Sequence, residues 1–287
     1  ATLIYGSQMA GMVSNVKYDG VLGMWYGKAP GVDRSGDIFR HANFLGVGKN
    51  GGVLAVAGDD PSCKSSTLPS QSEPALFDAM MPIFYPGNVQ EILDLGRYAY
   101  EMSRYSGLWS GFKIVTDIAD AFGSAIVHPE RININIPDFQ YNGQPWKHTQ
   151  NAKLVGHHSL PTEKEIHLGR IEAAKHFLAC NNINKITVQS DKDSIGIITA
   201  GKTYYDVVEA LDSLGWDDAF LNEKGIRILK LGVTFPVDSK IIKQFSKNLN
   251  EIFVIEEKRS FIEMLIKEEV YNYQNKPLIV GKSDEHN

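Results

Sequence analysis

The chain has 287 residues, 43% of them apolar, with a formal net charge of −5 and an isoelectric point near 5.9. This length suits one large domain or two ordinary ones, and the charge argues against nucleic acid or an anionic membrane as the main partner. The apolar runs are strand-sized, so we expect no membrane-spanning helix. Cys63 and Cys180 are too few for an iron–sulfur cluster or a zinc tetrad within this chain and suit a reducing cytoplasm.

The first ten residues, ATLIYGSQMA, are typical of the interior of a helix that lacks a capping residue. They contain no signal-peptide pattern. We therefore expect the chain to be an internal piece of a longer protein.

Short apolar runs next alternate with helical periodicity, which is typical of parallel α/β folds. Three strands are predicted in the first half, at residues 19–25, 51–58 and 111–117. An amphipathic helix is predicted at residues 88–107. Residues 128–161 are polar, and we interpret them as a surface linker that contains one alternating strand, RININI, at 131–136.

A helix is predicted from Thr162 to Ala179, with Thr162 and Glu165 as a capping box. Four strands with three intervening helices follow, the strands at residues 194–201, 226–232, 251–257 and 277–281. The predicted fold is therefore α/β, with two parallel-sheet domains, the second doubly wound. Its predicted divisions are a first domain at 1–138, a linker and connecting helix at 139–184, and a second domain at 185–287.

Two nucleotide-binding patterns fail on their structural context. Gly46, Gly48 and Gly51 spell G-x-G-x-x-G, but they precede a predicted strand instead of opening a helix. GIITAGKT, residues 196–203, matches a P-loop, yet residues 197–199 are β-branched and belong to a strand. The remaining loop is too short to wrap a triphosphate, so we disfavour an ATPase and expect a tight strand-to-helix turn.

GDD, residues 58–60, together with Asn88 loosely matches the magnesium diphosphate motif of thiamine enzymes. The final glycine of that motif is missing, and Asn88 follows Pro86-Gly87 as a helix cap would. We therefore predict no metal site in this chain.

Two polar loops are predicted directly after neighbouring strands, YGKAPGVDRSGD at residues 26–37 and GDDPSCKSSTLPSQSE at 58–73. Open parallel sheets bind ligands in the crevice at the carboxyl ends of their strands, so we predict that both loops face one cleft. The candidate binding residues are Lys28, Gly31, Asp33, Arg34, Asp59, Asp60, Ser65 and Ser66. The residues alone leave the ligand open.

These stretches resemble the pyrimidine-binding domain of indolepyruvate ferredoxin oxidoreductase, a 2-oxoacid:ferredoxin oxidoreductase. The resemblance lies in GVLGMWYGKAPGVDRSGDIFRHAN, GGVLAVAGDDPSCKSSTLPSQSE, DAMMPIFYPGNVQEILDLG and SRYSG. GIITAGKTYYDVVEAL, KLGVTFPVD and VIEEKRSFIEMLIKE resemble the transketolase C-terminal-like domain that follows in the same enzymes. The resemblance covers nearly the whole chain and is weakest in the linker.

The resemblance implies a thiamine diphosphate enzyme that oxidatively decarboxylates an arylpyruvate to an acyl-CoA. It implies Mg²⁺ with the cofactor, iron–sulfur clusters on other segments, and ferredoxin and coenzyme A as partners of the full-length protein. The catalytic glutamate of such enzymes would lie upstream of Ala1, so we assign no catalytic residue here. We expect this chain alone to be inactive and to bind the cofactor weakly or not at all.

The resemblance also implies self-association and contact with the remaining domains of the same enzyme, in the cytoplasm. DAMMPIF, which contains Met80, Met81 and Phe84, is one candidate for an exposed patch, although such runs are more often buried in a core. The alternative function is a non-catalytic α/β module that binds another anionic or phosphorylated ligand.

Overall fold

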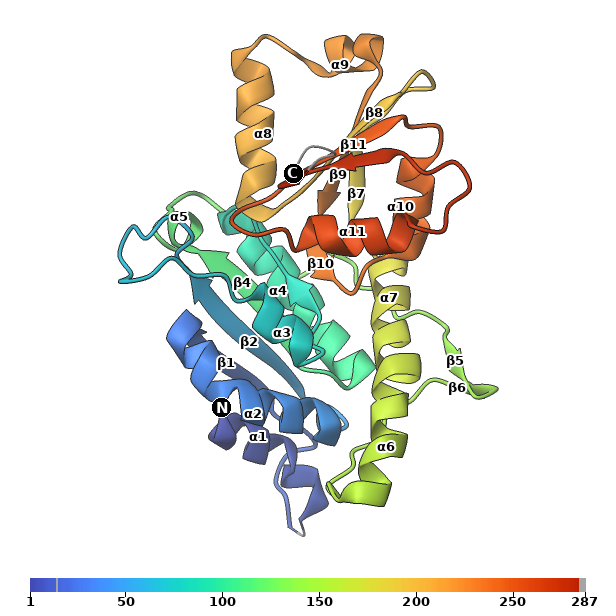
Figure 1. Cartoon of the computed structure of the whole chain (residues 1–287). Coiled ribbons are helices and arrows are strands. Elements are labelled where there is room, and N and C mark those ends of the chain that lie inside the picture. Colours follow the sequence, from blue (N-terminus) through green and yellow to red (C-terminus); the bar gives the residue numbers. More distant parts are fainter. Residues whose placement is uncertain (14, 284–287) are drawn as a thin grey trace.

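The computed structural model describes residues 1–13 and 15–283 and consists of two α/β units, one above the other in Figure 1. One five-stranded sheet has the order β1-β2-β4-β3-β10, and the other has the order β12-β11-β8-β9-β7. A small hairpin, β5 (Gln140–Tyr141) and β6 (Gln144–Pro145), projects from the segment that joins them. The predicted class, α/β with two largely parallel sheets, is confirmed.

The first sheet recruits a strand from the second half of the chain. Its strands are β1 (Leu22–Lys28), β2 (Gly52–Asp59), β3 (Ile83–Phe84), β4 (Ser110–Val115) and β10 (Val233–Phe235). The first four pair in parallel, whereas β10 is antiparallel to β3. The sequence did not predict this crossing, because a three-residue strand has no periodicity to detect.

The helices of the first unit are α1 (Thr2–Gln8), α2 (Ala29–Leu45), α3 (Glu73–Asp78), α4 (Val89–Ser106) and α5 (Thr116–Ala119), with a 3₁₀ turn at Ala10–Met12. The predicted helix α4 is confirmed. The Asn88 side chain caps it by accepting the Glu91 N–H at 2.9 Å, and Gly107 ends it with φ 88°. Asn88 is thus the helix cap that the sequence predicted.

The loop predicted at residues 26–37 is wrong: most of it is helix. β1 extends to Lys28 and α2 begins at Ala29, so Gly31, Asp33 and Arg34 lie in the first two turns of a helix. Pro30 near the helix start is already fixed at a helical φ, and buried side chains such as Phe39 pack the helix against the sheet. This burial outweighs the helix-weakening effect of the glycines.

The joining segment is more helical than predicted. α6 (Gly156–Glu165), a π-helical stretch at Ile166–Arg170 and α7 (Ile171–Cys180) form one rod beside the first unit (Figure 1). The capping box was wrong, because the helix starts earlier and the Thr162 hydroxyl donates back to the His158 carbonyl at 2.9 Å. The strand at 131–136 was also wrong: Asn135 pairs with the Asn181 side chain instead of a strand.

The second unit has the four predicted strands and one more. They are β7 (Lys185–Val188), β8 (Ile195–Ala200), β9 (Ile226–Leu231), β11 (Glu251–Ile255) and β12 (Leu278–Val280). The unpredicted β7 pairs antiparallel with β9. Its helices are α8 (Gly201–Ser213), α9 (Asp218–Lys224), α10 (Ser239–Ser246) and α11 (Ile262–Val270). Residues 197–199 lie in β8 and α8 starts at Gly201, so the predicted tight strand-to-helix turn is confirmed.

The two units meet backbone to backbone at a pair of glycines. Gly201 has φ 54°, and a Cβ there would overlap the Tyr85 ring. A Cβ on Gly87 would overlap the Gly201 carbonyl group. Only glycine permits this approach, which brings the carboxyl end of β8 against the segment after β3. Phe77 adds edge contacts to Phe235 and Phe261 with ring centroids 4.9 and 5.9 Å away.

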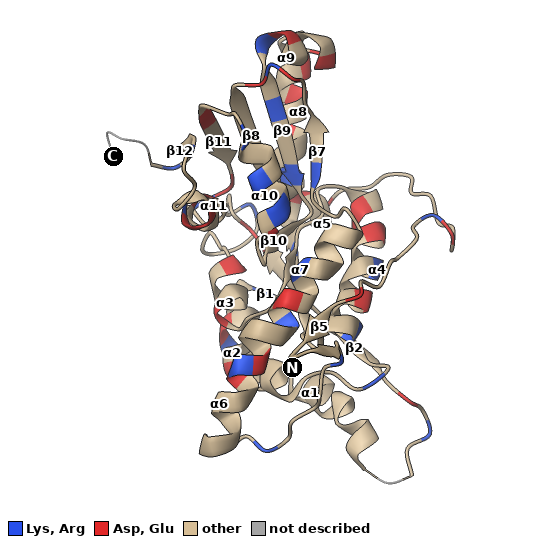
Figure 2. Ribbon diagram, turned by 90° about the vertical axis from the view of Figure 1, so that its right-hand side faces the viewer, with Lys and Arg blue, Asp and Glu red and all other residues tan. Residues whose placement is uncertain are grey.

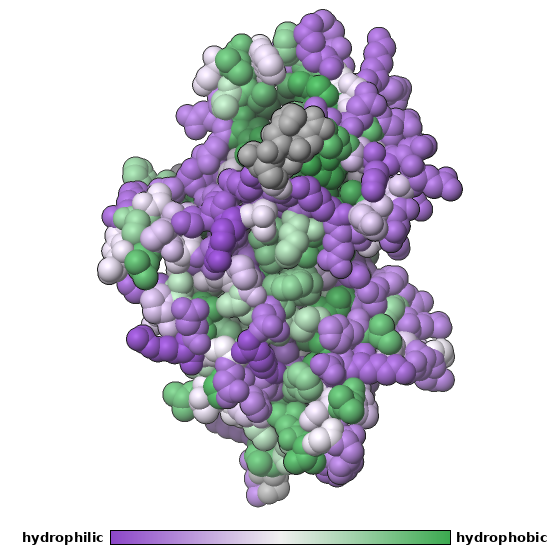
Figure 3. All heavy atoms as spheres, in the orientation of Figure 1, coloured by the Kyte–Doolittle hydropathy of each residue, from purple (hydrophilic) through white to green (hydrophobic). Residues whose placement is uncertain are grey.

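Charged side chains of both signs are spread over the surface of both units (Figure 2). Lys and Arg are interspersed with Asp and Glu over both units in Figure 2, and the face in Figure 3 is mostly hydrophilic with scattered apolar areas. Met81 and Phe84 are fully buried, so DAMMPIF is core and not an exposed patch. The edge strand β1 instead exposes Leu22, Met24 and Tyr26 on one face. Among the described residues, no helix is both long and apolar enough to cross a membrane.

Asn184 provides a test of the crossing strand β10. Its side-chain oxygen accepts the N–H groups of Gly232 and Val233 at 2.9 and 3.0 Å, and the residue is 4% exposed. We expect Asn184→Ala to lower the free energy of unfolding by about 2 kcal/mol, because two buried donors lose their acceptor. Urea unfolding measures this change. The exposed control Asn272→Ala should leave stability unchanged, and equal stability of both variants would contradict the prediction.

Candidate active-site cleft

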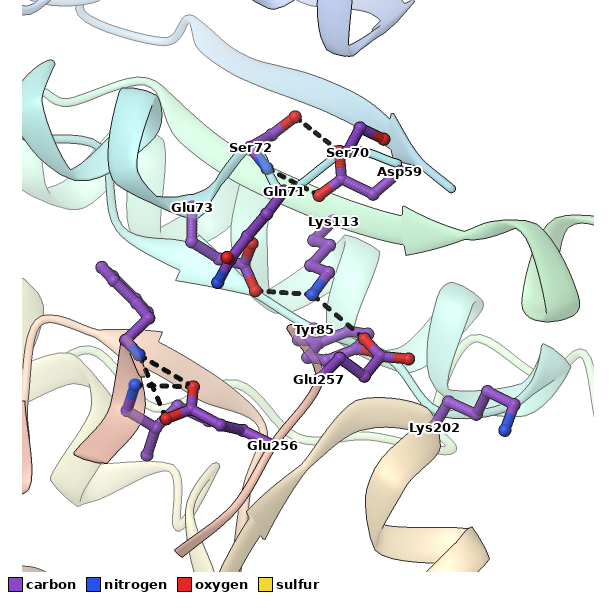
Figure 4. Close-up of polar contacts among 12 residues, drawn as sticks. Asp59, Ser70, Gln71, Ser72, Glu73, Tyr85, Lys113, Lys202, Glu256 and Glu257 are labelled. Atoms are coloured by element: carbon purple, nitrogen blue, oxygen red, sulfur yellow. Dashed lines mark hydrogen bonds and ion pairs between the residues drawn. The ribbon is translucent and has the colours of Figure 1, made fainter. Parts of the chain in front are cut away.

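A buried charge cluster lies where the carboxyl ends of the two sheets face each other (Figure 4). The Lys113 ammonium, from β4, donates to Glu73 Oε1 at 2.5 Å and to Glu257 Oε2 at 3.2 Å. Tyr85 donates its hydroxyl to Glu257 at 2.5 Å, and Lys113 Nζ lies 4.2 Å from the centre of the Tyr85 ring. Glu257 follows β11, so this cluster joins the first unit to the second.

Burial and neighbouring charges shift the pKa values of Lys113 and Tyr85. Burial of Lys113, which is 3% exposed, would by itself lower its pKa, but the carboxylates of Glu73 and Glu257 outweigh burial and raise the pKa. Burial and then the charge of Glu257 raise the pKa of Tyr85, so its phenol stays a neutral donor. One ammonium therefore sits between two carboxylates, and Glu73 Oε2 has no hydrogen-bond partner among the described residues.

The loop after β2 is organised by two inward-facing aspartates. Asp60 accepts the backbone N–H groups of residues 64–66 at 2.7–2.8 Å. Asp59 accepts both the N–H and the hydroxyl of Ser72, at 2.8 and 2.6 Å. These carboxylates are only 2% and 3% exposed. The hydrogen bonds, above all that from Ser65, lower the pKa of Asp60 to about 2.

A cleft of about 340 Å³ opens between the start of α2 and this loop. β1 and β2 pair side by side, with Lys28 opposite Gly58, so the two segments emerge at the same edge of the sheet. Lys28 and Asp33 line the cleft from one side, residues 66–71 line it from another, and Arg259 reaches it from the segment after β11.

Only some of the predicted site residues share this cleft. Lys28, Asp33 and Ser66 line it. The others lie elsewhere: Gly31 against Trp25, Arg34 and Ser65 on the exposed surface, and Asp59 and Asp60 behind the loop. Whether any of the eight binds a cofactor remains a prediction.

Sequence reasoning missed Arg259, Lys113, Glu73 and Glu257. The stretch VIEEKR, directly after a predicted strand, was a usable signal for Glu257 and Arg259, because ligand sites gather at strand ends. Lys113 gave no such signal, since a lysine inside an apolar strand does not reveal its partners.

The fold is shared with solved structures of a 2-oxoacid:ferredoxin oxidoreductase and a transketolase. The 2-oxoglutarate:ferredoxin oxidoreductase from Magnetococcus marinus superposes with a TM-score of 0.63 and 12% identity, covering 98% of this chain and 52% of that one. A split-gene transketolase superposes with a TM-score of 0.51 and 12% identity, covering 99% of this chain and 70% of that one.

Residues 185–287 match the family model described as "Indolepyruvate oxidoreductase domain". Across both units, the chain is 25% identical over 264 residues to the indolepyruvate oxidoreductase subunit IorA of Pyrococcus horikoshii, covering 88% of this chain. It spans about 37% of the length of that curated relative. The predicted resemblance to the indolepyruvate ferredoxin oxidoreductase family is confirmed.

The residues present do not fit the magnesium diphosphate end of thiamine diphosphate. The described residues contain no group of three or more His, Cys, Asp or Glu side chains that could hold a metal ion. The carboxylate oxygens of Asp59 and Asp60 accept hydrogen bonds from their own loop. The turn at Gly201 packs against Tyr85 and does not form a phosphate-binding loop. We therefore derive no catalytic step through the cofactor in this chain.

Replacing Lys113 tests the charge cluster. We expect Lys113→Met to lower the free energy of unfolding by about 3–5 kcal/mol, because it leaves the buried Glu73 and the half-buried Glu257 without their cation. Glu73→Gln keeps an oxygen acceptor for Lys113 and makes the cluster neutral, so we expect a loss of about 1 kcal/mol. Urea unfolding of both variants measures the difference. Equal losses would show that the ammonium does not hold the cluster together.

The lowered pKa of Asp60 predicts acid sensitivity of its loop. A carboxylate whose folded-state pKa lies below its ordinary value of 3.8 stabilises the fold above that value, and this stabilisation disappears as the pH falls towards about 2. We expect the protection factors of residues 61–71 in amide hydrogen exchange, which compare each rate with that of an unfolded chain at the same pH, to fall over this range in the native chain. Asp60→Asn should remove the pH dependence, whereas the exposed Asp191→Asn should retain it. Protection factors that do not change with pH in the native loop would contradict the role of Asp60.

Proposed function

We propose that this chain forms part of a thiamine diphosphate-dependent 2-oxoacid oxidoreductase that acts on an arylpyruvate such as indolepyruvate. The observation that carries the proposal is the similarity to the Pyrococcus horikoshii IorA subunit, which runs through both units and not only through one motif. Within this chain, the cleft at the strand ends offers Lys28 and Arg259 to an acidic substrate. An oxoacid is a suitable ligand for such a cleft because its carboxylate is always ionised near neutral pH.

The cofactor, when bound, supplies the carbanion and the electron sink of an oxidative decarboxylation. The residues of this chain form the substrate-binding part of the site. Asp59 and Asp60 stabilise the loop that lines the cleft, and the Lys113 cluster fixes the second unit against the first. We assign no catalytic residue to this chain.

The proposal extends to the full-length protein. It includes thiamine diphosphate with Mg²⁺, iron–sulfur clusters on other segments, ferredoxin as electron acceptor, coenzyme A as acyl acceptor, and a cytoplasmic location. The Magnetococcus marinus enzyme was solved with 2-oxoglutarate, coenzyme A and succinyl-CoA bound, which supports an acyl-CoA product. The apolar face of β1 supports contact with another domain or a second copy of the chain.

A second candidate function is a non-catalytic module that binds an anionic ligand. The specific observation in its favour is that the cations of the cleft all come from this chain and need no cofactor. Turnover in the full-length protein decides between the two candidates.

Turnover of the full-length protein tests the proposed function. We expect anaerobic reduction of ferredoxin that requires thiamine diphosphate, Mg²⁺ and coenzyme A. Indolepyruvate or phenylpyruvate should give a kcat/KM at least about tenfold above that of 2-oxoglutarate, because the cleft offers few cations for a second carboxylate. If no 2-oxoacid supports ferredoxin reduction, the oxidoreductase proposal is wrong. If 2-oxoglutarate is preferred, the arylpyruvate assignment is wrong.

The chain alone provides a separate measurement. We expect no ferredoxin reduction and no binding of magnesium thiamine diphosphate below the millimolar range in calorimetry, because the residues present do not fit the diphosphate end. Micromolar binding would mean that a loop of this chain holds the diphosphate after all.

A further inference from the structure

We propose that the cleft between α2, residues 66–71 and Arg259 is a carboxylate site, in which Lys28 and Arg259 bind the acid group of a monocarboxylic ligand. The proposal rests on the proposed function and deepens it: the ligand is the 2-oxoacid substrate, and the cleft selects for a single negative charge. The volume of about 340 Å³ is within the range of small-molecule sites.

The two cations are available for a ligand. Lys28 ends β1 with an exposed side chain, and among the described residues no acid lies within 4.0 Å of its ammonium or of the Arg259 guanidinium. Their charges are therefore not neutralised by direct ion pairs. Charge-assisted hydrogen bonds from such groups to a carboxylate are among the stronger polar contacts in proteins.

Long, exposed hydrogen bonds to Gln71 orient Arg259 without a ligand. Its backbone N–H and its Nε both donate to Gln71 Oε1 at 3.3 Å, and the Gln71 amide donates back to the Arg259 carbonyl at 3.4 Å. These contacts leave the two terminal guanidinium nitrogens without a protein acceptor among the described residues. A side chain that is already oriented loses less conformational entropy on binding. The orientation of the Arg259 guanidinium by Gln71 therefore favours binding of a ligand carboxylate.

The segment that carries Arg259 is anchored on both sides. Two residues before it, Glu257 binds Lys113 and Tyr85 of the first unit. After it, the Glu256 carboxylate accepts the backbone N–H groups of residues 261–263 at 2.8–3.1 Å. The contacts between the units thus place Arg259, a cation of the second unit, at the cleft of the first unit.

Asp33 sets the charge preference. It lines the same cleft from α2, so two cations face one carboxylate. The amino-terminal end of the 17-residue α2, which lacks a side-chain cap, adds a partial positive charge at Lys28 and Ala29. This balance suits one negative charge and penalises a second, because the second would meet Asp33.

Direct binding to this chain tests the site without any cofactor. Phenylpyruvate is the carboxylate probe and inorganic phosphate is the competing anion, each titrated by calorimetry against the chain and its variants. We expect Lys28→Met and Arg259→Met each to weaken phenylpyruvate binding about tenfold, because each removes one charge-assisted hydrogen bond. Asp33→Asn should tighten binding several-fold. Lys258→Met, a neighbouring exposed lysine that does not line the cleft, is the matched control and should bind as the native chain does.

Several results would overturn the proposal. They are no phenylpyruvate binding in the millimolar range, binding that survives both Lys28→Met and Arg259→Met, weaker binding by Asp33→Asn, and tighter binding of phosphate than of phenylpyruvate. The last would make the cleft a phosphate site. A matching unfolding midpoint for each variant excludes loss of folding as the cause.

Failure of this proposal is distinguishable from failure of the proposed function. An active full-length enzyme whose KM for arylpyruvate is unchanged by Arg259→Met rejects the cleft and keeps the function. Cleft-dependent binding of phenylpyruvate by this chain, with no turnover in the full-length protein, keeps the cleft and rejects the function.

Discussion

One buried ammonium group holds the two units in register. Lys113 comes from the centre of the first sheet and is neutralised by Glu73 of the same unit and Glu257 of the other. A buried charge is costly unless it is paired, so the chain cannot separate its units without exposing an ion pair that has no other partner. The relative position of the two strand-end surfaces, and therefore the approach of Arg259 to the cleft of the first unit, depends on this contact.

The backbone reinforces the same junction. Gly87 and Gly201 approach so closely that any side chain on either would collide with the opposite unit, and β10 extends the first sheet with residues of the second half of the chain. A second polar contact, in which Lys230 of β9 binds Glu91 of α4 and Tyr205 of α8 donates to the same carboxylate at 2.7 Å, lies beside it. Because these contacts are buried or half-buried and polar, they specify one orientation instead of merely favouring contact.

The loop after β2 has two roles: some of its residues stabilise the loop itself, and others line the cleft. Asp59 and Asp60, the most suggestive residues of GDDPSCKSST, turn inward and satisfy backbone N–H groups, while the residues at the mouth of the cleft are Lys28, Asp33 and Arg259. Asp60, which accepts three N–H groups, has little capacity left for a metal, and each oxygen of Asp59 already accepts a hydrogen bond from Ser72. The geometry shows which side chains of this loop bind its own backbone and which line the cleft.

The sequence by itself determined the α/β class, the helix capped by Asn88 and the strand identity of residues 197–199, because each follows from local periodicity or from a side chain bonding its own backbone. It also placed the two segments that line the cleft on neighbouring strands, since β1 and β2 follow one another in the chain and in the sheet. Only the tertiary structure decided that residues 29–37 are helical, because the burial of Val32 and Phe39 against the sheet outweighs two glycines. Only the tertiary structure places Arg259 and Lys28, which are far apart in the sequence, around one cleft. Only the tertiary structure also places Lys113 between the carboxylates of Glu73 and Glu257. Such contacts join residues that share no local pattern, so they exist only once the whole chain has packed.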